Sequence, residues 1–140
     1  VPQAAAWLGG AGVLPFAGLA LAAWIAPEPW GSTAYGGLVA YGTAILSFMG
    51  GCRWGFAAAG LGEGPTWRPI ALSVLPALWA WALSFIGGTL QPLGLAAGFA
   101  ALLWADVVLT RQGGAPVWWP ALRWPLTLGA VSALVAGAAA

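Results

Sequence analysis

The sequence carries very little charge. Its 140 residues include four basic and three acidic side chains, so that 5% of the chain is charged while 61% is hydrophobic. A soluble domain has roughly 25% charged residues, and this chain could not cover a surface in water with so few. The net charge of +1 leaves no basic patch for nucleic acid. The composition therefore indicates an integral membrane protein whose first partner is the lipid bilayer.

Histidine is absent, and Cys52 is the single cysteine. Without imidazole the chain cannot hold haem, chlorophyll or zinc through histidine, and it cannot form a Ser–His–Asp triad. One thiol allows no internal disulfide. These absences predict a protein that is not an enzyme and has no intrinsic cofactor. Contacts with lipid, quinone or pigment stay open, since they need none of the missing groups.

The apolar runs predict an all-α fold. A membrane-spanning helix needs about 20 mostly apolar residues, and turns rich in proline and glycine separate the runs. The whole chain, residues 1–140, is thus expected to form one membrane domain of five transmembrane helices. The predicted spans are 4–26, 34–59, 69–86, 93–109 and 125–139. Segment 110–124, which is rich in tryptophan and proline, could instead lie along the membrane surface.

Arginine placement predicts the orientation. Arg53 and Arg68 flank the second loop, Arg111 and Arg123 flank the fourth, and the other two loops carry only Glu28. Because basic residues collect on the cytoplasmic side, we expect a cytoplasmic N-terminus and a C-terminus outside. Tryptophans are expected to anchor the chain at the membrane interfaces rather than to form a cage for a planar ligand. The predicted anchors are Trp7, Trp67, Trp118, Trp119 and Trp124.

Small residues recur at four-residue steps along three of the predicted helices. Such faces let helix backbones approach closely in a membrane. The predicted packing positions are Thr43, Ser47, Gly51 and Gly55 in the second helix, Gly94 and Gly98 in the fourth, and Gly129, Ala133 and Gly137 in the fifth.

Arg53 and Asp106 are the charged residues inside predicted spans. An ionisable residue within a membrane span is costly and calls for a partner. The two residues should lie at similar depth near the cytoplasmic ends of their helices, which predicts an ion pair between them. Two alternatives stay open for Arg53, contact with lipid phosphates and a role in catalysis or transport. Arg53 also points away from the small-residue face, since it lies roughly 200° around the helix from Gly51.

Several blocks of the sequence resemble a known family. "LGGAGVLPFAGL", "YGTAILSFMGGCRWG", "SVLPALWAWALSF" and "GFAALLWAD" look like successive blocks of the DUF3429 family, the transmembrane protein 69-like proteins. The block containing Gly50, Arg53 and Trp54 is the most specific part. The resemblance implies a small multi-helix membrane protein, mitochondrial in animals and widespread in proteobacteria, with no assigned activity. In this family the Arg53 position can also look like histidine, which weakens any role that needs a guanidinium.

Two functions are expected to compete. The first is a non-catalytic accessory or assembly subunit beside a larger energy-transducing complex, photosynthetic or respiratory, which short loops and small-residue faces favour. The second is a tryptophan-rich membrane protein that binds or carries a small ligand such as porphyrin, quinone or lipid. The absence of lysine and the abundance of alanine, glycine and tryptophan are typical of a GC-rich bacterial genome. The expected location is therefore a bacterial inner membrane, cytoplasmic or intracytoplasmic.

Overall fold

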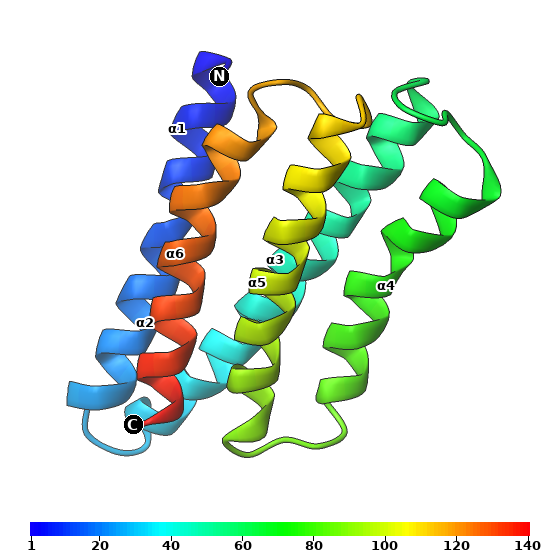
Figure 1. Cartoon of the computed structure of the whole chain (residues 1–140). Helices are drawn as coiled ribbons and strands as arrows, with labels where there is room; N and C mark the ends of the chain where they lie inside the picture. The colour runs from blue at the N-terminus through cyan, green and yellow to red at the C-terminus, as the bar shows by residue number, and fades with distance from the viewer.

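The chain forms a bundle of helices. The computed structural model describes all 140 residues and contains no strand. Its helices are α1 (Gln3–Ala11), α2 (Val13–Ile25), α3 (Trp30–Ala58), α4 (Trp67–Leu83), α5 (Leu90–Arg111) and α6 (Trp119–Ala138). Figure 1 shows them running side by side, with the N-terminus and the α3–α4 and α5–α6 loops at one end and the C-terminus at the other.

The first two helices form one interrupted rod. Pro15 has no backbone N–H, so the carbonyl of Ala11 loses its usual partner four residues on, and the chain breaks at Gly12 between α1 and α2. The hydroxyl of Tyr41 in α3 donates a hydrogen bond of 2.7 Å to the Gly12 carbonyl. A polar contact from the neighbouring helix therefore ties the break into the bundle.

Helix α3 is the centre of the bundle. It packs against α2, α4, α5 and α6, and its buried glycines permit close approach. A methyl group on Gly50 would lie 2.6 Å from the backbone oxygen of Ser73 and 3.2 Å from the ring of Pro76. A methyl group on Gly42 would meet the side chains of Leu95 in α5 and Leu134 in α6 at 3.2 and 3.3 Å. The position of Gly50 thus sets how closely α3 and α4 cross.

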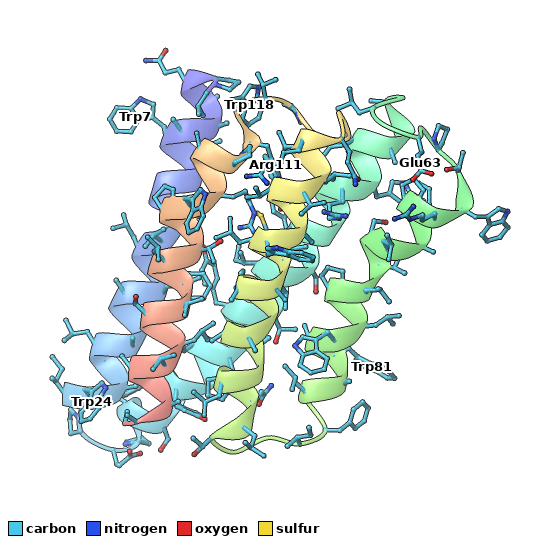
Figure 2. All side chains as sticks on the ribbon, in the orientation of Figure 1. Trp7, Trp24, Glu63, Trp81, Arg111 and Trp118 are labelled. Carbon is cyan, nitrogen blue, oxygen red and sulfur yellow. The ribbon has the colours of Figure 1, made fainter.

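The helices are those of a membrane protein. Three stretches are long and apolar enough to cross a bilayer: Gln3–Ile25, which is α1 and α2 together, Leu90–Arg111 and Trp119–Ala138. Large apolar side chains such as Leu8, Phe85 and Trp104 point outward, which suits hydrocarbon rather than water. Figure 2 shows Trp7 and Trp118 at one end of the bundle and Trp24 and Trp81 toward the other.

The first predicted span, 4–26, agrees with the stretch Gln3–Ile25, which is interrupted only at Gly12. The start of the last predicted span differs from the structure. The last span was predicted to begin at residue 125, whereas α6 begins at Trp119, so residues 119–124 of segment 110–124 belong to this helix. Pro120 is tolerated there since the first turn of a helix needs no donor at that position, and Pro125 lies inside the helix. The side chains of residues 119–124 therefore extend from the first turns of α6 and not from a loop.

Candidate functional site: a buried charge cluster beside an apolar cavity

The carboxylate of Asp106 joins two helices to α5. Its Oδ1 accepts a hydrogen bond of 2.6 Å from Nη1 of Arg53 in α3. Its Oδ2 accepts two bonds of 3.0 Å from α6, one from Nε of Arg123 and one from Nε1 of Trp119. Trp119 and Arg123 are four residues apart, so both lie on the same face of α6. One side chain thus fastens three helices at the end of the bundle that holds the arginines.

The cluster is almost fully removed from solvent. Asp106 is 0% exposed, the side chain of Arg123 is 1% exposed and that of Arg53 is 10% exposed. Buried charges are costly unless they are paired and hydrogen-bonded, and three charge-assisted donors meet that need for the carboxylate. Two guanidinium groups face one carboxylate, however, and arginine stays protonated. The cluster therefore carries a net charge of +1 in a buried place.

Two polar atoms beside the cluster have no partner. Nη2 of Arg123 and Oγ1 of Thr127 are buried and make no hydrogen bond. The two residues are four apart in α6 and share a face. Leaving a buried donor unpaired costs free energy, more so when the donor is charged. These atoms therefore mark the place where the site is chemically incomplete.

An apolar cavity of about 420 Å³ adjoins Arg123. Its wall comes from α1 and α2, residues 45–52 of α3, Phe99 of α5, and α6. Thirteen of its sixteen lining residues are hydrophobic, and Arg123 is the charged residue among the sixteen. Trp119 also lines this cavity, edge-on to Phe56 with ring centroids 5.0 Å apart.

A second cavity, of about 490 Å³, lies on the other side of α3. Helices α3, α4 and α5 form its wall, and Arg53 lines it together with Trp79 and Pro76. Arg53 thus borders this cavity and Arg123 the first one, and Asp106 pairs with both arginines. The charge cluster separates two apolar spaces at one end of the bundle.

Both oxygens of Asp106 accept hydrogen bonds from donors of this chain. No group of three or more cysteine, aspartate or glutamate side chains comes together. What the site offers chemically is a guanidinium nitrogen without an acceptor beside an apolar space.

Five of the predicted packing residues lie between helices of this chain. An added methyl group would meet Leu83 at Gly94, Trp79 and Leu46 at Gly98, Val13 at Gly129, and Leu38 at Gly137. Ala133 is buried in the core. These positions hold α5 and α6 close to their neighbours.

The small-residue face of α3 points outward at its two glycines. Nothing lies within 4 Å of a methyl group added at Gly51 or Gly55. The hydroxyls of Thr43 and Ser47 donate to carbonyls of their own helix, Val39 and Thr43, at 2.8 Å. Because Arg53 must point inward to reach Asp106, residues two positions away turn outward. Within this chain, therefore, no other helix packs against Gly51 or Gly55, while Thr43 and Ser47 are half-buried.

The prediction that Trp119 is an interfacial anchor is wrong, and the sequence did not identify Arg123 as part of the buried cluster. Trp119 is 5% exposed and bonded to Asp106, so it does not anchor the chain at the membrane surface. Arg123 was counted only as a loop charge. The signal that could have found both is their four-residue spacing, once residues 119–124 are assigned to a helix. Trp7, Trp67 and Trp124 are exposed, and Trp118 is half-buried against Trp119.

Comparison with known proteins identifies relatives without naming an activity. The family model described as "Protein of unknown function (DUF3429)" matches residues 1–139. Transmembrane protein 69 of Xenopus tropicalis is 38% identical over 137 residues, which cover 96% of this chain and 53% of that protein. The chain therefore spans about half the length of this curated relative. No solved structure matches.

Proposed function

The chain belongs to the DUF3429 family, and from that premise we propose that it is a non-catalytic accessory or assembly subunit of a larger membrane complex. The complex would be energy-transducing, photosynthetic or respiratory, in a bacterial inner membrane, cytoplasmic or intracytoplasmic. The occupant of the docking surface would be a transmembrane helix of another subunit. One observation carries the proposal, the outward small-residue face of α3.

This face, defined here as Thr43, Ser47, Gly51 and Gly55, offers a close contact without a partner in the chain. Glycine at both positions leaves the backbone of α3 accessible from outside the bundle. In a bilayer, helices associate through such small-residue faces because van der Waals packing replaces the hydrophobic driving force. Helix propensity alone would disfavour glycine by about 1 kcal/mol relative to alanine. Close approach by a partner helix would explain why glycine, and not alanine, stands at these positions.

The same proposal includes the full topology. All five rods, α1–α2, α3, α4, α5 and α6, would cross the bilayer, with the N-terminus cytoplasmic and the C-terminus outside. Helix α3 packs along four other helices, so it must share their depth although its serine, threonine and glycine residues lower its hydropathy. The four arginines and the α3–α4 and α5–α6 loops would face the cytoplasm.

Co-purification tests the docking surface. The tagged full chain would be isolated from native membranes in mild detergent, and its partners identified by mass spectrometry. Gly51→Leu and Gly55→Leu should abolish recovery of a stoichiometric partner without lowering the melting temperature of the isolated bundle. Gly18→Leu is the matched control, since Gly18 lies in α2 and also has nothing within 4 Å. Recovery of wild-type chain alone, or equal recovery with all three variants, would count against an accessory role.

Labelling of introduced cysteines tests the topology. In a Cys52→Ala background, cysteines at Glu63 and Gln112 should be protected from a membrane-impermeant maleimide added to intact cells. Cysteines at Glu28 and Gly88 should be labelled. The reverse pattern would invert the proposed orientation, and labelling of all four sites would remove the five-span arrangement.

A second candidate function is the binding or carriage of a small hydrophobic ligand such as porphyrin, quinone or lipid. The two apolar cavities of about 420 and 490 Å³ favour it, because sites for small molecules usually enclose roughly 300–1,000 Å³. An absorption spectrum and a lipid extract of the purified chain would separate coloured ligands from lipids.

A further inference from the structure

The cavity beside Arg123 has one polar end and a long apolar wall. Arg123 lies in the second turn of α6, near the end of the bundle where Figure 2 places Trp7 and Trp118. The wall continues along α6 as far as Ala130, seven residues or about 10 Å deeper. The cavity therefore has its one charged residue near the end of the bundle and apolar residues deeper, which is how a lipid is oriented in a leaflet.

The charge at the polar end favours an anion. Asp106 neutralises only one of the two guanidinium groups around it, and Nη2 of Arg123 is buried without an acceptor. An acidic headgroup beside the guanidinium group of Arg123 would balance the net positive charge and bring an acceptor close to the unpaired donor. Guanidinium groups pair well with carboxylate and phosphate oxygens. A neutral ligand would satisfy the donor but leave the buried charge.

The cavity opens sideways. Helix α1 packs against α2 and α6 and has no contact with α3, although both contribute to the wall. Leu8 of α1 and Phe48 of α3 line the cavity and are 75% and 63% exposed. The opening thus lies between α1 and α3 on the flank of the bundle. In a membrane, that flank faces hydrocarbon, so the occupant can enter from the bilayer.

We propose that this cavity binds one acyl chain of a single-chain lipid whose acidic headgroup, carboxylate or phosphate, pairs with the guanidinium group of Arg123. The chain lies against Met49, Phe99 and Ala130, which line the cavity's deeper part. The site rests on the second candidate function and is independent of the docking face of α3.

Photoaffinity labelling tests the site with the full chain in phosphatidylcholine nanodiscs. The probe is a fatty acid that bears a diazirine in its tail, and labelled positions are mapped by mass spectrometry. Labels should concentrate in 45–52 of α3 and 122–130 of α6. Oleate, lysophosphatidate and oleyl alcohol then compete. A charge-assisted hydrogen bond predicts that at least one of the two acids competes at about tenfold lower concentration than the alcohol, and which acid does so identifies the headgroup.

Variants separate the cavity from the outer surface. Ile45→Phe narrows the cavity and should remove most of the labelling, whereas Leu128→Phe, on the exposed face of α6, should leave it unchanged. Arg123→Gln should abolish the preference for acids. If Arg123→Gln does not fold, the comparison of acid with alcohol still tests the headgroup contact.

Two results would overturn the proposal. Labels spread evenly over the outer faces of the helices, and unaffected by Ile45→Phe, would show that no lipid site exists. Equal competition by oleyl alcohol would contradict the preference for an anionic headgroup. It would leave a lipid-binding cavity, and with it the second candidate function, in place.

Discussion

Nε of Arg123 and Oδ2 of Asp106 lie 3.0 Å apart in a part of the bundle where both side chains are almost completely buried. The carboxylate is shared, because Arg53 takes the other oxygen at 2.6 Å. Asp106 is therefore the single anion that balances two cations. Its loss should affect the fold more than the loss of either arginine partner.

Asp106→Asn should lower the free energy of unfolding by about 3–5 kcal/mol, because it leaves two buried guanidinium groups with no counter-ion. Thermal or denaturant unfolding of the purified chain in detergent measures this. Glu63→Gln, in the exposed α3–α4 loop at the same end of the bundle (Figure 2), is the control and should change little. Wild-type stability of Asp106→Asn would show that the cluster does not hold the helices together.

Arg53→Ala should cost clearly less than Asp106→Asn. Removing Arg53 leaves a neutral pair of Asp106 and Arg123 with two of the three donors still in place. The test is which of the two substitutions lowers the free energy of unfolding more. If Arg53→Ala were the more damaging change, Arg53 would have to stabilise the bundle through something other than Asp106.

Trp119→Phe should isolate the indole hydrogen bond. Phenylalanine keeps an aromatic ring against Phe56 but removes the donor to Asp106. A hydrogen bond to a charged group contributes about 1.5–3 kcal/mol, and unfolding experiments should show a loss of that size. Trp124→Phe is the matched control on α6, because Trp124 is 52% exposed. Equal effects of both substitutions would reduce Trp119 to a packing residue.

Gly50→Ala and Gly51→Ala should have opposite effects although the residues are adjacent. The methyl group at Gly50 would meet the backbone of Ser73 in α4, and overpacking of this kind costs about 1–3 kcal/mol. At Gly51 nothing lies within 4 Å, so alanine should be neutral or stabilise the isolated bundle by up to about 1 kcal/mol through helix propensity. Melting temperatures of the two variants in the same detergent give the comparison. Destabilisation by Gly51→Ala would mean that this face is packed.

Tyr41→Phe should loosen the junction between α1 and α2. The variant removes the donor to the Gly12 carbonyl and leaves a part-buried acceptor without it, at a cost of about 1–3 kcal/mol. Hydrogen exchange followed by mass spectrometry should show that residues 3–14 exchange faster in the variant than in the wild type, while exchange in α5 stays the same. Unchanged exchange there would show that α1 is held by its apolar contacts alone.

Much about this protein follows from its composition and its local patterns. Few charges and long apolar runs determine a helical membrane protein, because only a hydrocarbon solvent suits such a surface and only helices satisfy their own backbone there. The order of the helices and the turns between them also follow, since proline and glycine interrupt the runs. The depth of Arg53 and Asp106 could be estimated from helix length, and the structure places their side chains in contact.

Only the tertiary structure decided which residues share the interior with that pair. Arg123 and Trp119 lie 17 and 13 residues from Asp106, across a loop. An arginine and a tryptophan near the end of a helix can face either lipid headgroups or a buried carboxylate, and the sequence pattern is the same in both cases. The direction of the Gly51 face was equally open. It depends on the rotation of α3 about its own axis, which agrees with both the bond from Arg53 to Asp106 and the burial of Leu46 and Gly50. Periodicity defines a helix face, but only packing against the other helices defines what the face touches.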